Sequence, residues 1–161
     1  MIEKIKDSQI ILSWGVTVAL AWLLTPVMAA QAFTATQAMY VWTALMAVPL
    51  ALTGLLKYRG DSNKIFDMWA LLVTLLMIEN FLTPLQFAMY SYFHVWFIAG
   101  AFGFYYTSKR LPPPSKKTYR YAAYASIAVL PAVFYRPLLS PLIAIFVQGG
   151  PILYDWYTVH R

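Results

Sequence analysis

Long apolar stretches recur along this chain, and short polar stretches separate them. A helix needs roughly 20 mostly apolar residues to cross the hydrocarbon core of a membrane, which is about 30 Å thick. The pattern therefore predicts an all-α fold, a polytopic integral membrane helical bundle with six transmembrane helices. The expected spans are Ile10–Ala30, Ala38–Leu56, Ile65–Leu82, Phe87–Tyr106, Tyr119–Tyr135 and Leu138–Tyr157.

The composition favours lipid over water as the solvent of this fold. Hydrophobic residues make up 61% of the chain and charged residues 11%, and the mean hydropathy is +0.60. A soluble domain is nearer to half apolar and a quarter charged. A soluble fold of 161 residues would also leave a large area in water. We therefore expect one transmembrane domain, residues 1–161, in the cell membrane and in contact with its lipids.

The basic residues indicate how the chain is threaded. Cytoplasmic loops of membrane proteins carry an excess of Lys and Arg. Here every Lys and Arg except Arg136 lies near a chain end or beside the second and fourth gaps between spans: Lys4, Lys6, Lys57, Arg59, Lys64, Lys109, Arg110, Lys116, Lys117, Arg120 and Arg161. Both termini are therefore predicted to be cytoplasmic. The net charge of +6 follows this threading, so we expect no nucleic-acid partner.

The first span also resembles a secretory signal peptide. A charged start precedes an apolar run that ends in Ala30-Gln31-Ala32, and small residues in this arrangement are typical of a cleavage site. Cleavage there, or the merging of two spans, would reduce the number of spans to five.

Local signals agree with the third span. Ser62 or Asn63 can cap the helix, and Asp67 follows in its first turns near the positive end of the helix dipole. The residue before a proline avoids the helical conformation, so Thr83-Pro84 should end this helix. Tyr and Trp residues near the span ends suit an interfacial belt: Trp42, Tyr58, Tyr105, Tyr106, Tyr119, Trp156 and Tyr157.

Glu79 and His94 are ionisable residues inside apolar spans, and such residues are candidates for function. The turn at Thr83-Pro84 would bring them to similar depth, where they could act as a catalytic acid and base. The alternatives are structural. Glu79 would reach the interface with Asn80 or bond a backbone carbonyl, and His94 would bond Tyr90. Two ligands do not complete a metal site, so no metal is expected. The sequence identifies no cofactor.

A face of the fourth span could line a pocket for a flat or long apolar ligand, such as an isoprenoid-like molecule. The residues on this face are spaced by three or four positions: Tyr90, His94, Phe97, Ala101 and Tyr105. Asn80, near the end of the third span, is a further candidate ligand contact. The alternative is that these aromatic residues serve packing and the interfacial belt.

The sixth span contains Gln148, Gly149, Gly150 and Pro151 near its middle. A proline removes a backbone donor and clashes with the preceding turn, so we expect a kink. Broken membrane helices can present backbone groups to a substrate or ion, and these residues are therefore candidate ligand contacts. The alternative is a kink that serves packing alone.

Three classes of function remain open. The first is a non-enzymatic bundle that binds an apolar ligand, or that forms a homo-oligomer or joins other membrane subunits in a larger complex. The second is a small oligomeric transporter or channel. The third is an intramembrane enzyme that acts on a lipid or isoprenoid, with Glu79 and His94 as acid and base. The first is favoured because the sequence holds no familiar catalytic motif and its loops are short.

Overall fold

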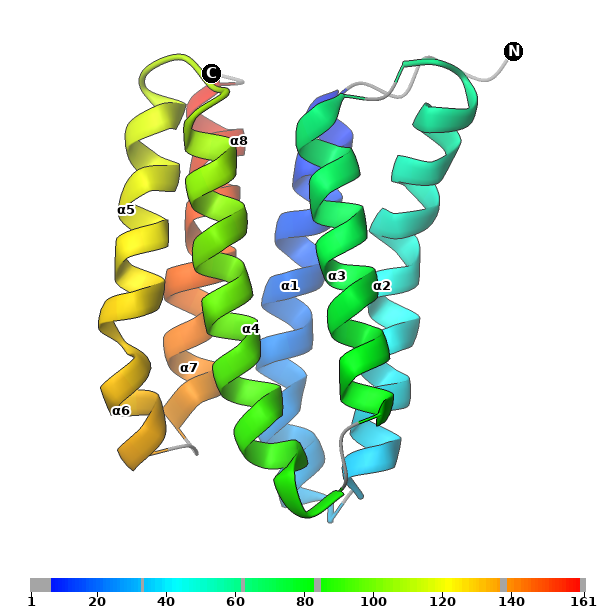
Figure 1. Cartoon of the computed structure of the whole chain (residues 1–161), viewed down its shortest axis with the longest axis vertical. Helices are drawn as coiled ribbons and strands as arrows, with labels where there is room; N and C mark the ends of the chain where they lie inside the picture. Colours follow the sequence, from blue (N-terminus) through cyan, green and yellow to red (C-terminus); the bar gives the residue numbers. More distant parts are fainter. Residues whose placement is uncertain (1–6, 33, 62, 83–84, 137–138, 160–161) are drawn as a thin grey trace.

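In the computed structural model, the chain forms a bundle of helices that run up and down along a common axis (Figure 1). The structure describes residues 7–32, 34–61, 63–82, 85–136 and 139–159; within these ranges, the side chains of residues 7–9, 29, 35, 85–93 and 159 are not described. The described residues contain no β-strand, which confirms the all-α prediction. The helices are α1 (Asp7–Ala30), α2 (Ala35–Tyr58), α3 (Lys64–Leu82), α4 (Leu85–Ser108), α5 (Ser115–Ala128), α6 (Leu130–Tyr135), α7 (Ser140–Ala144), η2 (Ile145–Gly149) and α8 (Gly150–Val159).

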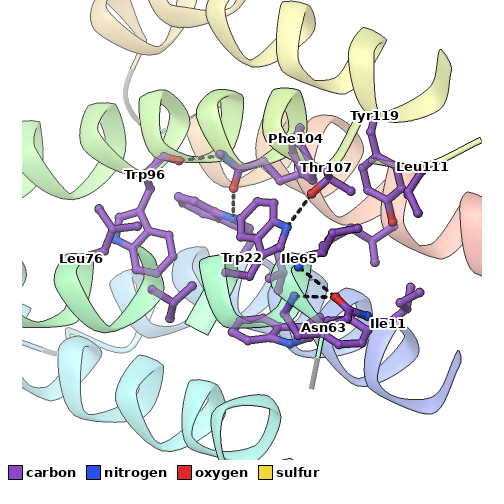
Figure 2. A pocket seen from close by; sticks show the side chains of 18 of the residues that line it. Ile11, Trp22, Asn63, Ile65, Leu76, Trp96, Phe104, Thr107, Leu111 and Tyr119 are labelled. Carbon is purple, nitrogen blue, oxygen red and sulfur yellow. Dashed lines mark hydrogen bonds between the residues drawn. The ribbon is translucent and has the colours of Figure 1, made fainter. Parts of the chain in front are cut away.

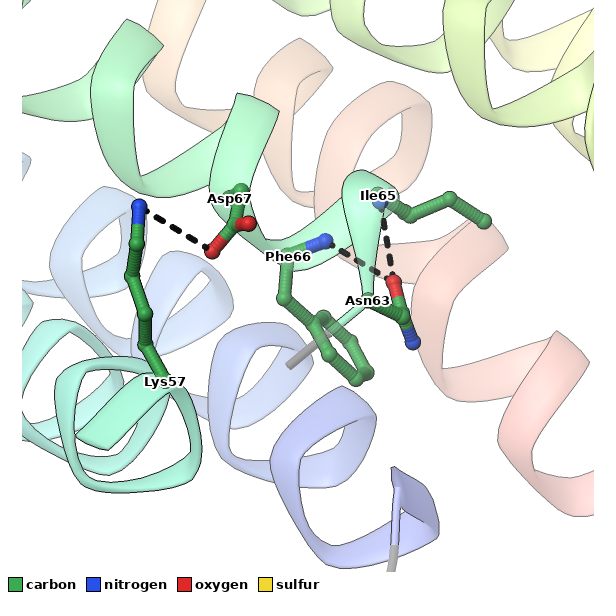
Figure 3. A network of polar contacts seen from close by, with 5 residues as sticks. All are labelled: Lys57, Asn63, Ile65, Phe66 and Asp67. Atoms are coloured by element: carbon green, nitrogen blue, oxygen red, sulfur yellow. Dashed lines mark hydrogen bonds and ion pairs between the residues drawn. The ribbon is translucent and has the colours of Figure 1, made fainter. Parts of the chain in front are cut away.

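The starts of α2 and α3 are set by side-chain caps. At α2, Thr34 accepts a hydrogen bond from the backbone N–H of Gln37, and the Gln37 side chain accepts one from the backbone N–H of Thr34. At α3, the side-chain oxygen of Asn63 accepts hydrogen bonds from the backbone N–H groups of Ile65 and Phe66, at 2.9 and 3.2 Å (Figure 3). Asn63 is thus the predicted cap of the third span, because it satisfies N–H groups that have no partner within the helix.

Asp67 lies in the first turn of α3 and forms an ion pair with Lys57, in the last turn of α2 (Figure 3). The two charged atoms are 3.8 Å apart, and the side chain of Lys57 is 70% exposed. Ion pairs with this exposure contribute little to stability, about 0–1 kcal/mol. The pair therefore orients the connection between α2 and α3 more than it strengthens it. The predicted turn at Thr83-Pro84 lies outside the described residues.

The fifth expected span is two helices rather than one. α5 ends at Ala128, and α6 begins at Leu130 with a proline in its first turn. Pro131 has no N–H for the carbonyl oxygen of Ile127, so the helical hydrogen-bond pattern breaks there. The expected span Tyr119–Tyr135 is thus divided between α5 and α6 at Pro131.

The sixth expected span is also interrupted, at the predicted kink. α7 leads into η2, a turn of π-helix, and α8 follows. The N–H of Gly150 bonds the carbonyl oxygen of Ile145, five residues back. Pro151 cannot donate to the carbonyl oxygen of Val147, and a wider turn accommodates this missing bond. Single π-turns inside helices are rare and often mark functional sites.

Helices α1 and α4 lie at the centre of the bundle. α1 packs against α2 on one side and against α7, η2 and α8 on another, while α4 packs against α3 and α5. α1 begins and α8 ends at the same end of the bundle, where α2 also connects to α3 and α4 to α5 (Figure 1). We call this the basic end, because Lys57, Arg59, Lys64, Lys109, Arg110, Lys116, Lys117 and Arg120 lie in or beside these connections.

The outer surface of the bundle is apolar. Among the residues that the structure describes, three helices are long and apolar enough to cross a membrane, over Ile10–Met28, Thr36–Tyr58 and Lys64–Leu82. Large apolar side chains are exposed along them at intervals of three or four residues, as at Leu20, Leu23 and Val27 of α1 or Leu71, Leu75 and Ile78 of α3. A helix that is apolar on its inner and its outer face is typical of a membrane span. Soluble proteins rarely expose apolar stripes of this extent.

Tryptophan side chains dominate the interior. The rings of Trp22 and Trp42 meet edge to face with centroids 4.8 Å apart. The ring centroids of Trp42 and Trp96 are 5.1 Å apart. Trp42 is only 1% exposed and Tyr119 only 4% exposed. The prediction that these two residues belong to an interfacial belt was therefore wrong.

Candidate functional site

A cavity of about 140 Å³ lies inside the bundle, between α1, α3, α4 and α8 (Figure 2). Most of its wall is aromatic or aliphatic. Of the six tryptophans in the sequence, only Trp156 is absent from the wall. The lining residues are Ile11, Trp14, Val18, Trp22, Trp42, Asn63, Ile65, Phe66, Trp69, Val73, Leu76, Trp96, Gly100, Phe104, Thr107, Leu111, Tyr119, Gln148 and Ile152.

The cavity has a closed floor and a mouth. Its floor is made by buried side chains: Trp22, Trp42, Leu76 and Trp96. Partly exposed residues form the mouth: Ile11, Asn63, Ile65 and Leu111. Figure 2 shows Leu76 and Trp96 at one end of the cavity and Ile11 and Leu111 at the other. The mouth opens at the basic end, because Ile11 is close to the start of α1, Asn63 precedes α3 and Leu111 follows α4.

Gln148 of η2 forms a polar bridge beside the floor. Its side-chain oxygen accepts a hydrogen bond of 3.0 Å from the indole N–H of Trp22, on α1. Its amide nitrogen donates to the backbone carbonyl of Trp96, on α4, at 3.1 Å (Figure 2). One buried side chain thus joins three separate segments of the bundle. Polar groups buried in an apolar interior are costly unless they are bonded in this way.

Two glycines let α4 approach its neighbours closely at this site. A Cβ atom on Gly100 would lie 2.7 Å from the amide nitrogen of Gln148, and one on Gly103 would overlap the ring of Trp69. The indole N–H of Trp69 donates to the hydroxyl of Thr107 at 2.9 Å, and that hydroxyl donates to the backbone carbonyl of Gly103. Gly103 therefore makes room for a tryptophan that is held in place by its own hydrogen bond.

Trp14 and Trp96 differ from the other indoles of the wall. They are 6% and 5% exposed, and within the described residues their buried N–H groups have no hydrogen-bond acceptor. A buried donor without a partner costs roughly 1–3 kcal/mol. Two such donors in one cavity are therefore the feature of this site that most needs an explanation.

Tyr119 is the one ionisable residue in the described lining of the cavity. It packs against Phe104, with ring centroids 5.9 Å apart, and its hydroxyl interacts with the carboxylate of Asp155 on α8. Asp155 is 3% exposed. The two residues lie on α5 and α8, near the basic end.

Of the residues predicted to contact a ligand, Gln148 lines the cavity. Gly149 instead packs against Ala19 of α1, where an added Cβ would lie 3.1 Å from the Ala19 side chain, and Gly150 begins α8. These two glycines form the junction that turns Gln148 inward. As ligand contacts, they remain a prediction.

The predicted ligand face of α4 is displaced from the observed one. The residues of α4 that line the cavity are Trp96, Gly100, Phe104 and Thr107. Of the predicted residues, Phe97 packs on Trp22 with centroids 5.9 Å apart. Tyr105 is 42% exposed and lies under the ammonium group of Lys109. The side chain of Tyr90 lies outside the described residues, and Asn80 is buried near the end of α3.

Glu79 and His94, the predicted acid and base, are both half-buried. The ring of His94 meets Phe134 of α6 edge to face, with centroids 5.8 Å apart. On the same helix, Gly103 lies against Trp69 of α3. Gly103 is nine residues after His94, which corresponds to two and a half turns of helix. His94 and Gly103 thus lie on opposite faces of α4. A direct pair between His94 and Glu79, on α3, gains no support from this placement, and their catalytic role remains a prediction.

Sequence reasoning missed most of the cavity wall. The signal that was available is the position of Trp22 and Trp96, which lie far from the ends of their spans and so do not suit an interfacial belt. The described residues contain no cluster of three or more His, Cys, Asp or Glu side chains that could hold a metal ion. No protein-family model, curated protein sequence or solved structure matches this chain.

Proposed function

We propose that this protein is a membrane-embedded bundle that binds an apolar ligand in its central cavity, through a hydrogen-bond acceptor on that ligand. The observation that carries the proposal is the pair of buried indole N–H groups, on Trp14 and Trp96, that find no acceptor in the described part of the chain. A ligand carbonyl, ether or similar oxygen would satisfy one of them and remove a cost of roughly 1–3 kcal/mol.

The shape and chemistry of the wall support a flat or slender ligand. The cavity of about 140 Å³ is close in size to engineered apolar cavities of roughly 150 Å³ that bind benzene. Tryptophan and phenylalanine side chains offer flat faces, and aromatic pairs contribute about 0.5–1.5 kcal/mol beyond the area that they bury. A ring or a single hydrocarbon chain fits such a slot, whereas a lipid with two chains is too wide for it.

The wall favours binding over catalysis. General acid–base chemistry requires an ionisable group within hydrogen-bonding reach of the substrate. Tyr119 is the one such group in the described lining, and neither Glu79 nor His94 contributes to the cavity. An enzyme that uses Glu79 and His94 would therefore need a second site.

We further propose that the bundle is a multi-pass protein of the cell membrane with its basic end in the cytoplasm. The apolar outer stripes of α1 and α3 and the clustering of cations at one end support this threading. The mouth of the cavity would then open toward the cytoplasmic leaflet.

A small transporter is the second candidate. The π-turn at Ile145–Gly149 favours it, because a locally widened helix beside a cavity can change its hydrogen bonding when a substrate passes. The described cavity has a mouth at one end and a floor at the other, so it does not form a passage through the bundle. A transporter would therefore need a homo-oligomer or a complex with other membrane subunits to complete the pathway for its substrate.

Photolabelling with benzophenone tests the proposed function. Benzophenone is apolar, carries one carbonyl acceptor, and forms covalent bonds with nearby C–H groups under ultraviolet light. We expect peptide mapping of the labelled protein to place the label on α1, α3 and α4 at lining residues. Val73→Phe should reduce labelling severalfold, because Val73 is 2% exposed and lies in the wall.

Val48→Phe is the matched control, because Val48 is 56% exposed on α2 and the same change there leaves the cavity untouched. Thermal unfolding of both variants shows whether each is folded. Equal labelling of the two folded variants, or labelling confined to the outer apolar surface, would contradict the proposal.

A further inference from the structure

The mouth of the cavity and the cations of the protein lie at the same end of the bundle. Lys64 stands between the mouth residues Asn63 and Ile65 and is exposed. On α5, Lys116 precedes the lining residue Tyr119 by three positions, so the two side chains lie on one face of that helix. Cations therefore approach the mouth from two sides, from α3 and from α5.

Among the described side chains, no ion pair joins Lys64 or Lys116 to an acidic residue. Asp67 pairs with Lys57, and Asp155 is buried and interacts with Tyr119. Asp61 is exposed in the connection before α3. Lys109 and Arg110 are stacked on the rings of Tyr105 and Tyr106 of their own helix. Lys64 and Lys116 are thus the cations best placed to act on a group at the mouth.

Membrane threading explains why cations gather at one end, but it does not explain why the cavity opens there. Along α3, the lining of the cavity runs from Ile65 at the mouth to Leu76 on its floor. These twelve residues span about 18 Å of helix. The slot is apolar along its walls and cationic at its mouth, which is the pattern of a site for a molecule with one apolar chain and an anionic head.

We propose that the ligand of the cavity is a single-chain amphiphile whose anionic head, a carboxylate or a phosphate, is held at the mouth by Lys64 and Lys116. This inference rests on the proposed function and specifies the class of ligand that the same cavity binds. The tail fills the slot between the tryptophans. An oxygen near the head reaches Trp14, which lies seven residues into α1 on the mouth side of Trp22.

Equilibrium binding to the purified protein in neutral detergent tests this proposal. The probes are hexanoate and hexyl phosphate, and hexanol is the neutral alcohol with the same chain, which is short enough for a cavity of about 140 Å³. We expect at least one anion to bind about tenfold more tightly than the alcohol, as a charge-assisted hydrogen bond requires. This preference should shrink as salt rises from 0.05 to about 0.5 M, because exposed charges are screened.

Variants locate the head group. The double variant Lys64→Gln with Lys116→Gln should remove most of the preference for the anion and leave the affinity for the alcohol within about twofold. The double variant Lys117→Gln with Arg136→Gln removes the same charge from two exposed positions, one on another face of α5 and one at the opposite end of the bundle, and it should keep the preference. Because the two anions share one chain, binding of hexanoate alone or of hexyl phosphate alone identifies the head as a carboxylate or a phosphate and supports the proposal.

Each remaining outcome overturns it. Equal affinity for the anion and the alcohol would contradict the proposal that the ligand has an anionic head. A preference for the anion that survives in the Lys64 and Lys116 double variant would contradict the proposal that these two lysines hold it. The proposed function would still stand in that case if benzophenone labels the cavity wall. If no amphiphile binds and benzophenone also misses the wall, both the inference and the proposed function fail.

Discussion

The side-chain oxygen of Gln148 accepts a hydrogen bond of 3.0 Å from the indole nitrogen of Trp22, across 126 positions of sequence. The same glutamine donates to the backbone carbonyl of Trp96. This bridge ties α1, α4 and the π-turn together beside the floor of the cavity. We therefore regard it as the contact that fixes the shape of the site.

Replacing Gln148 with leucine should lower the free energy of unfolding by about 1–3 kcal/mol, because the buried N–H of Trp22 loses its acceptor. Chemical unfolding of the detergent-purified protein measures this change. Gln31→Leu is the control, since Gln31 is exposed beyond the end of α1 and should shift stability by less than about 0.5 kcal/mol. Equal effects of the two substitutions would show that the bridge is not a structural contact.

Gly103→Ala should destabilise the bundle by about 1–3 kcal/mol, because the new methyl group overlaps the ring of Trp69 in a packed interior. Gly54→Ala offers a matched comparison within α2, where an added Cβ meets nothing within 4 Å. This second change should stabilise the protein by about 0.5–1 kcal/mol, since alanine favours the helix. Thermal unfolding separates them, and a stabilising Gly103→Ala would refute the close packing of α4 on α3.

Trp14→Phe should weaken benzophenone binding about tenfold with a small loss of stability, because the N–H that it removes bonds no described protein group. Trp22→Phe should cost more stability, because it breaks the bond to Gln148. Fluorescence titration gives the affinities, and unfolding curves give the stabilities. A Trp14→Phe variant that binds benzophenone as tightly as the original protein would remove the hydrogen-bond component of the proposed site.

Cysteine labelling tests the threading, and the chain has no cysteine of its own. Gln31→Cys and Arg136→Cys lie at the end opposite to the basic end, and both positions are exposed. An impermeant thiol reagent should modify them in intact cells. Lys117→Cys, exposed at the basic end, should react only after the cells are opened. Reaction of Lys117→Cys in intact cells would reverse the proposed orientation.

The helices could be predicted from sequence because their signals are local. The expected spans Ile10–Ala30, Ala38–Leu56 and Ile65–Leu82 lie within α1, α2 and α3 and miss their bounds by three residues at most. Apolar length and caps such as Asn63 are properties of neighbouring residues. The breaks at Pro131 and Pro151 also have local causes, since each proline lacks the N–H that would continue the helix.

The cavity was harder to predict because α4 is apolar on several faces. In a soluble helix, the apolar stripe identifies the buried side. In α4, Phe102 is 59% exposed while Phe104 is 1% exposed, and no pattern of polarity distinguishes them. Gln148 was identified because a polar side chain in the middle of a span is rare and has to be satisfied.

Native mass spectrometry of protein extracted from its own membrane in mild detergent shows whether the cavity holds an apolar ligand. We expect the original chain and Val48→Phe to retain one small molecule per bundle, and Val73→Phe to have lost it. The same spectra report any partner subunits and the oligomeric state. Absence of a retained molecule from the folded original chain, or equal retention by the folded Val73→Phe variant, would contradict the account.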